Sequence, residues 1–267
     1  MLHRLGGYRF SAAAHAYDIY EHGGDWWLDE KLHEAKFIHT STEMGRNSMI
    51  ERGHEPEKIH VIRRGMMSFP ECRELREDRS TLRIICIARL VAKKGFGHQL
   101  KIYADLKANE VPFEVRIVGE GPERARIEQQ IQALGLRNCV DLLGQLDQAE
   151  VMGQLRWADV LLHTGIVAQS GDRDGLPNVI PEAMIAGVLV FTSPHAATTE
   201  AITDGETGWV LSVEETEKWS QTLASVRGHD PQLDSIRQAA RQWAEDNYNG
   251  EKNARKLSAL FVESVTE

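Results

Sequence analysis

Two carboxylates eight residues apart stand out in the stretch RDGLPNVIPEAMIAG, at residues 173–187. Asp174 precedes a Gly-Leu-Pro-Asn corner, and Glu182 lies about one turn into the apolar segment that follows. A carboxylate only accepts hydrogen bonds and has several lone-pair sites, so Glu182 could hold two hydroxyls of a vicinal diol such as a ribose. Asp174 would then face a second polyhydroxyl group. The pattern alone fits a solvated helix start equally well, because acids there also satisfy the helix dipole.

A second group of chemically useful residues lies in the stretch ARLVAKKGF, after an apolar segment that predicts a strand. Arg89 and Lys94 are five residues apart, and Gly95 then opens a helical pattern. Two fixed cations beside a helix N-terminus suit a diphosphate, although taken alone such cations are more often solvated. Gly119 and Gly121 in VGEGPE follow another predicted strand. They are a weaker signal, and a tight turn explains them equally well.

The segments that must position these residues alternate between short β-branched runs and longer amphipathic ones, from residue 81 to about residue 230. The first kind predicts strands and the second predicts helices. Strands separated by helices of this length form right-handed βαβ units on a parallel sheet. We therefore predict a doubly wound α/β domain over residues 81–231. Ligands bind beyond the carboxyl ends of the strands in such sheets, and all three candidate groups lie there.

The remaining segments predict a smaller unit and its connections. Residues 1–68 contain three candidate strands and two helices, which is about half of a nucleotide-binding-like domain. The segment 69–80 is polar and charged without periodicity, and is interpreted as a linker. Residues 232–267 predict two amphipathic helices whose apolar faces need a partner surface.

The bulk composition excludes several classes of function. The net charge of -9 argues against non-specific binding to nucleic acid, which needs clustered Lys and Arg. The three cysteines are widely spaced and form no CxxC pair, so we expect reduced thiols and neither a disulfide framework nor a zinc site. No apolar run approaches the ~18–20 residues that cross a bilayer, and no signal peptide is recognisable. These features predict a cytoplasmic protein, with peripheral attachment to the inner face of a membrane left open.

Six segments resemble the retaining glycosyltransferases of family 4, which have the GT-B architecture of two Rossmann-like domains facing a cleft. In the family's order and spacing they are EPEKIHVIRRGM, IARLVAKKGF, RIVGEGPERARIEQQIQALGL, VDLLGQL, DGLPNVIPEAMIAGVLVFTS and EAITDGETGWVLS. The stretch with the two acids resembles the family's Glu-x7-Glu motif, but its first acid is Asp174 rather than Glu. A catalytic contact that loses the reach of about one methylene can cost on the order of 100-fold in rate.

The resemblance implies a role for each matched residue. Glu182 would hold the donor ribose, and Asp174 would contact the transferred sugar. Arg89 and Lys94 would grip the donor diphosphate and stabilise the leaving group, and His15 in AAAHAYDIY would approach the reacting sugar. The donor-binding positions that the resemblance implies are Gly119, Gly121, Leu143, Gly175, Leu176, Pro177 and Glu182.

We interpret the sequence as a glycosyltransferase that moves a sugar from a nucleoside-diphosphate sugar to a glycan or lipid-linked acceptor, with retention of configuration. No metal or other cofactor is implied, because Arg89, Lys94 and the helix dipole would take the metal's role. The family also implies a role in assembling surface polysaccharide or lipopolysaccharide.

Two other functions stay open. In the family, a fuller sheet and a glycine-rich acceptor loop precede the HAYDI segment, so most of the acceptor half is expected to be missing. The chain could then be a non-catalytic or split-enzyme subunit that binds sugar nucleotide and needs a second chain, or another copy of itself, at its N-terminal domain. An NAD-linked dehydrogenase is disfavoured, because no GxGxxG follows a predicted strand.

Overall fold

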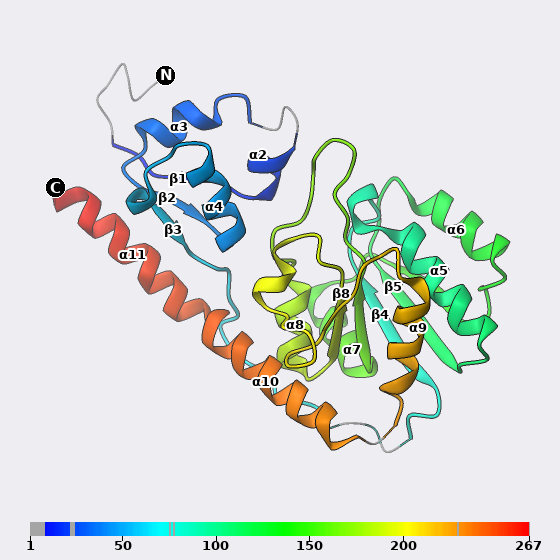
Figure 1. Cartoon of the computed structure of the whole chain (residues 1–267). Coiled ribbons are helices and arrows are strands. Elements are labelled where there is room, and N and C mark those ends of the chain that lie inside the picture. The colour runs from blue at the N-terminus through cyan, green and yellow to red at the C-terminus, as the bar shows by residue number, and fades with distance from the viewer. Residues whose placement is uncertain (1–8, 22–24, 75, 77, 229, 267) are drawn as a thin grey trace.

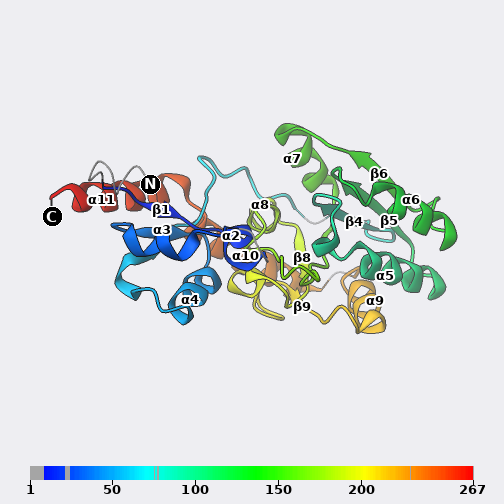
Figure 2. The ribbon, with the colours of Figure 1, turned by 90° about the horizontal axis from the view of Figure 1, so that it is seen from above.

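The computed structural model describes residues 9–21, 25–74, 76, 78–228 and 230–266, which form two parallel sheets side by side (Figures 1 and 2). The N-terminal sheet has three strands and the second sheet has six. The predicted α/β class, with a doubly wound sheet and a smaller parallel sheet before it, is confirmed. Parts of the predicted N-terminal domain (1–8 and 22–24), the predicted linker (75 and 77) and the predicted C-terminal helices (267) lie outside the described residues.

The elements alternate along the chain as the hydrophobic pattern predicts. In the N-terminal part they are β1 (Ala12–Ala13), α2 (Ala16–Tyr20), α3 (Leu28–Glu34), β2 (Ile38–Thr40), α4 (Glu43–Glu51) and β3 (Ile59–Val61). The larger sheet contains β4 (Leu82–Ile87), β5 (Phe113–Val118), β6 (Val140–Gly144), β7 (Val160–His163), β8 (Leu189–Thr192) and β9 (Trp209–Val210). Its helices are α5 (Phe96–Ala108), α6 (Arg124–Ala133), α7 (Gln148–Trp157), α8 (Val179–Ala186) and α9 (Thr216–Ser225), followed by α10 (Pro231–Asn247) and α11 (Gly250–Thr266).

The strand order of the large sheet reverses between β4 and β7. The order is β6-β5-β4-β7-β8-β9, so β5 and β6 lie on one side of β4, and β7, β8 and β9 lie on the other side. Every pair in this sheet is parallel. The loops after β4 and β7 therefore emerge next to each other, at the point where ligands bind in open α/β sheets.

Helices cover both faces of this sheet, because successive strand residues point to opposite sides. In β4, Ile84 and Cys86 belong to a core formed with α5, α6 and α9, whereas Ile85 belongs to a second core formed with α7, α8 and α10. Both faces are apolar, which explains why these strands read as nearly continuous hydrophobic runs. The sheet is thus a rigid platform for the loops at its edge.

The predicted linker carries a structural role that its polar composition does not reveal. Asp159 is fully buried at the start of β7, and it accepts hydrogen bonds from Arg76 at 2.7 Å and from Arg73 at 3.1 Å. Arg79 is also buried and donates to the backbone carbonyls of Val226 and Gly228. The described part of segment 69–80 forms no helix or strand, yet its arginines attach it to the large sheet.

The C-terminal helices run from the large sheet to the small one (Figure 1). Helix α10 packs on α8 through Ala240 and Ala244. Helix α11 reaches the small sheet, where the ring of Phe261 lies 5.1 Å from that of Phe37. Among the described residues, no helix combines the length and apolar character required to span a membrane.

One helix of the large domain is not evident from the hydrophobic pattern. Helix α9 has the segment TEKWSQTLAS, in which Trp219 and Leu223 are the only large apolar residues. Both side chains are fully buried against the sheet, and the Trp219 indole donates to the Ser212 carbonyl at 2.8 Å. Tertiary packing on two residues thus stabilises a helix that the sequence signals only weakly.

Candidate functional site

The loops after β4 and β7 bring one of the two predicted cations and the first acid into contact. Lys94 donates to Asp174 Oδ2 at 2.6 Å, although the two residues are far apart in the sequence. Gly95 allows this approach, since a Cβ there would collide with the Thr164 carbonyl of the β7 loop. The positively charged and sugar-compatible groups predicted from two separate strand ends therefore form one cluster.

Two further residues belong to this cluster that the sequence pattern does not single out. Lys93 is buried and contacts Asp172 at 2.8 Å and Asp174 at 3.6 Å. His163 is buried, and its Nε2 atom lies 3.2 Å from Asp174 Oδ2. The position of His163 at the carboxyl end of β7 was the available signal, whereas nothing in the KK pair reveals that both lysines turn toward Asp174.

The surroundings of Asp174 keep its carboxylate ionised. Burial alone would raise its pKa, but His163 and Lys94 together hold the pKa well below the usual range of aspartate. Burial also lowers the pKa of His163, which favours a neutral ring. Asp174 is therefore a pre-ionised, positioned hydrogen-bond acceptor.

Arg89 lies on the same edge but faces solvent. Its side chain forms no hydrogen bond or ion pair within the described residues. The adjacent β5 loop packs against this turn, because a Cβ at Gly119 or Gly121 would collide with the Ala88 or Leu90 carbonyl. The two glycines thus have a packing role.

Glu182 projects from the first turn of α8. Its Oε1 atom accepts a long hydrogen bond of 3.4 Å from Gln148, and burial raises the pKa of its carboxyl group. Asn178 occupies the N-cap position of α8, but its side chain makes no capping hydrogen bond. It accepts a hydrogen bond from the Tyr248 hydroxyl instead.

The remaining predicted residues divide between the large sheet and the boundary with the small one. Leu143, near the end of β6, packs at the margin of the second core, Leu176 is buried, and Pro177 is partly exposed. Gly175 faces the small sheet, because a Cβ there would lie 3.5 Å from Thr42 and 3.8 Å from Ala16.

His15 lies immediately before Ala16, at the N-terminal boundary of α2, and its ring centroid is 6.2 Å from that of His39. Burial lowers the pKa of His15, which favours its neutral form. The loop that carries Asp174 and Gly175 therefore approaches the segment that carries His15.

Most of the chain is similar in sequence to known proteins. The family model described as Glycosyl transferases group 1 matches residues 71–243. WcaL of Salmonella typhimurium, assigned to colanic acid biosynthesis as a glycosyltransferase, is 31% identical over 78% of this chain and 52% of its own length. The amylovoran biosynthesis glycosyltransferase AmsK of Erwinia amylovora is 30% identical over 81% of this chain and 53% of its own length. The chain thus spans about half the length of these curated relatives.

Solved structures share the arrangement of the two sheets. HepE of Anabaena, solved in complex with UDP, has a TM-score of 0.78 at 17% identity and covers 98% of this chain and 74% of its own. TarM of S. aureus, also solved with UDP, has a TM-score of 0.80 at 16% identity and covers 95% of this chain and 50% of its own. At these identities the likeness shows the fold, and the expected GT-B-like fold is confirmed.

Proposed function

Because the chain belongs to the group 1 glycosyl transferases, we propose that it transfers a sugar from a nucleoside-diphosphate sugar to a glycan or lipid-linked acceptor. The observation that carries this proposal is the cluster of Lys93, Lys94 and Asp174 at the switch point of the large sheet. Relatives named for colanic acid and amylovoran biosynthesis support a surface polysaccharide as the product. We propose a cytoplasmic site of action, next to lipid-linked acceptors.

In this proposal the donor replaces contacts that the free protein makes internally. The diphosphate binds Arg89, Lys94 and the N-terminal end of α5, which favours anions. The ribose hydroxyls donate to Glu182, and the sugar hydroxyls donate to Asp174 beside the Gly175 and Leu176 amides. Gly119, Gly121, Leu143 and Pro177 border the nucleotide. The UDP bound in HepE and TarM makes UDP the first nucleotide to test.

We further propose the retaining chemistry of family 4. The acceptor hydroxyl oxygen forms a bond to the anomeric carbon on the face from which the diphosphate leaves. The bond from that carbon to the phosphate oxygen breaks, its electron pair stays on the diphosphate, and the hydroxyl proton moves to the same diphosphate. Arg89, Lys94 and the α5 dipole stabilise the charge that develops there, so no metal is assigned to the step. His15 contacts the reacting sugar from the other side.

A ligand panel tests the proposed function. Calorimetry with UDP, GDP, their sugars and NADH should show binding of a nucleoside diphosphate and its sugar, and none of NADH. Incubation of the bound sugar nucleotide with oligosaccharide or lipid-linked acceptors should yield a glycoside, and NMR of its anomeric proton should report retention. Binding of NADH alone would favour the dehydrogenase, and an inverted product would overturn the retaining mechanism.

Replacing Glu182 with Gln should affect binding and stability in opposite directions. Loss of the charged acceptor should weaken nucleotide binding by about 1.5–3 kcal/mol. Since burial raises the pKa of Glu182, its ionised form destabilises the free fold, and this cost is present above the ordinary glutamate pKa and absent well below it. The variant should therefore melt at a higher temperature than wild type at pH 7, with the difference vanishing in acid.

Calorimetry and thermal melts measure the two effects. The exposed Glu206, replaced with Gln, is the matched control and should change neither quantity. Wild-type nucleotide affinity in the Glu182 variant would remove this residue from the ribose site.

A second candidate function is that of a donor-binding chain whose acceptor surface is completed by a second chain or by another copy of this chain. The exposure of Trp26 and Trp27, at 84% and 65%, favours it, since adjacent tryptophans are rarely left in water. The chain alone should then bind sugar nucleotide but turn it over slowly, because the acceptor is not positioned and water is not excluded. Turnover assays combined with light scattering test this, and rapid transfer by a demonstrated monomer would contradict it.

A further inference from the structure

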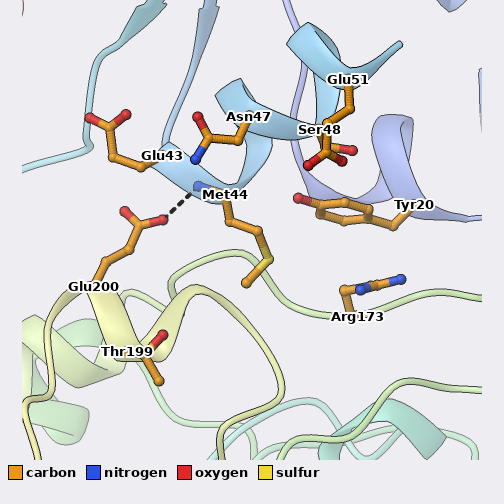
Figure 3. A pocket seen from close by; sticks show the side chains of 9 residues that line it. All are labelled: Tyr20, Glu43, Met44, Asn47, Ser48, Glu51, Arg173, Thr199 and Glu200. Carbon is orange, nitrogen blue, oxygen red and sulfur yellow. Dashed lines mark hydrogen bonds between the residues drawn. The ribbon is translucent and has the colours of Figure 1, made fainter.

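A cavity of about 530 Å³ lies between the two sheets, beside the loop that carries Asp174 (Figure 3). Helices α2 and α4 form its upper wall, and Arg173 with the 3₁₀ helix Ala197–Glu200 forms the lower one. The volume falls in the ~300–1,000 Å³ range of small-molecule sites. The sequence does not indicate this cavity, because its walls come from segments that no local pattern links.

One face of α4 supplies unpaired polar groups to the cavity. Glu43, Asn47 and Glu51 are spaced four residues apart and therefore lie on the same side of the helix. Neither glutamate forms an ion pair within the described residues, and all three side chains are exposed. Glu51 is the last residue of α4, where the helix dipole disfavours a negative charge. Its position therefore has a cost in the free protein that a bound hydrogen-bond donor would offset.

Arg173 in the lower wall and Tyr20 in the upper wall have polar atoms without partners among the described residues. The guanidinium of Arg173 lies over the Tyr20 ring, 4.7 Å from its centre. The Arg173 Nε atom and the Tyr20 hydroxyl are both shielded from solvent, and neither has a hydrogen-bond partner of normal geometry within the described residues. Buried donors of this kind are uncommon and mark places where a partner is missing.

Glu200, by contrast, already has partners for both of its carboxylate oxygens. Its Oε1 atom accepts from the Met44 N–H at 2.8 Å, and its Oε2 atom pairs with Arg63 at 2.7 Å. These contacts join the 3₁₀ helix of the large domain to the start of α4 and to the segment after β3. The cavity wall is therefore held in place by direct contacts between the large domain and the N-terminal part.

We propose that this cavity binds an uncharged saccharide as the acceptor of the proposed transfer, an inference that rests on the proposed function. Glu43, Asn47 and Glu51 on α4 offer carboxylate and amide oxygens to sugar hydroxyls. Arg173 offers N–H donors to sugar oxygens. Arg173 directly precedes Asp174, so a saccharide here lies against the loop assigned to the donor sugar. Among the described residues that line the cavity, Glu43 and Glu51 have no ion-pair partner, and Arg173 is the one cation. This excess of negative charge disfavours a uronic acid or a phosphate.

Saturation-transfer NMR on the full chain tests the proposal, with and without saturating UDP. The probes are the methyl glycosides of glucose, galactose and mannose, compared with methyl glucuronide. At least one neutral glycoside should bind, and the glucuronide should bind more weakly. Asn47→Ala and Glu51→Gln should each weaken binding about 3- to 10-fold, the scale of one or two hydrogen bonds. Asn138→Ala and Glu30→Gln, both at exposed positions away from the cavity, are the matched controls.

Affinity for UDP separates this proposal from the function on which it rests. Every variant should bind UDP like wild type, because none of these residues belongs to the donor site. Saccharide binding that is unchanged in Asn47→Ala and Glu51→Gln would overturn the cavity assignment while UDP binding still supported a transferase. Preference for the glucuronide would overturn the uncharged substrate class. Absence of binding to any nucleoside diphosphate would overturn the proposed function itself.

Discussion

Replacing Lys94 with Ala should weaken the binding of a nucleoside diphosphate by about 1.5–3 kcal/mol, the scale of hydrogen bonds to charged groups. Binding of the free nucleoside should stay unchanged, because the proposed role of Lys94 concerns only the diphosphate. In the free protein Lys94 is held at the switch point by Asp174, at 2.6 Å. The cation is therefore fixed in place before the donor arrives, and little ordering is required on binding.

In Lys94→Ala, the rate of sugar transfer should fall by a larger factor than the affinity for the nucleoside diphosphate. Charge develops on the diphosphate as its bond to the sugar breaks, so a fixed cation stabilises the transition state more than the bound donor. Loss of one such group typically reduces the rate by about 10²–10³. The exposed Lys101 on α5, replaced with Ala, is the control for a general loss of positive charge.

Calorimetry with UDP and uridine, followed by turnover assays, distinguishes the possible results. Equal losses for nucleoside and nucleoside diphosphate would mean that Lys94 has a structural role only. Arg89→Ala should behave like Lys94→Ala in binding, but with less effect on stability, since the exposed Arg89 side chain forms no hydrogen bond or ion pair within the described residues.

Replacing Asp159 with Ala should destabilise the fold by about 3–5 kcal/mol, as expected when one partner of a buried ion pair is removed. Asp159 accepts from Arg73, Arg76 and the Arg83 N–H, and its side chain has no exposed surface. Its loss would leave the partly buried guanidinium groups uncompensated and would release the segment between the two sheets. A fall in melting temperature on the order of 10 °C is expected.

The pH dependence of stability provides an independent check. Burial alone would raise the pKa of Asp159, but Arg76, the Arg83 N–H and Arg73 hold it below its ordinary value of 3.8. An acid whose pKa is lowered by folding stabilises the protein above its unfolded pKa, and this contribution is lost as the pH falls through the folded value. Wild type should therefore lose more stability below pH 4 than the variant does.

Asp141 on β6 is exposed and makes no ion pair within the described residues, so Asp141→Ala is the matched control. Thermal melts across pH 2–8 compare the three proteins. A melting temperature of Asp159→Ala within about 2 °C of wild type at pH 7 would show that the arginines do not depend on this carboxylate.

Local sequence determined the elements of the large sheet and the edge at which its candidate residues lie. Strand β4 reads as a nearly continuous apolar run because both of its faces are covered, with Ile84 and Ile85 in opposite cores. Such runs, with amphipathic helices between them, leave a parallel sheet as the favoured arrangement. Arg89, Lys94, Asp174 and Glu182 each follow a strand, and chain order alone is enough to assign them to the carboxyl edge. The domain boundaries at residues 68, 80 and 231 stay predictions.

Tertiary structure decided which of these residues meet. Hydrophobic periodicity carries no information on the partners of charged side chains, so the sequence did not distinguish Lys93, which turns into the acid cluster, from the solvent-exposed Arg89. The anchoring of the polar segment 69–80 by the buried Asp159 was hidden for the same reason. The cavity beside Arg173 depends on α4 and the 3₁₀ helix Ala197–Glu200 coming together across the two sheets. Contacts between segments so distant in sequence form only when the sheets pack, because each segment is compatible with many partners until packing selects one.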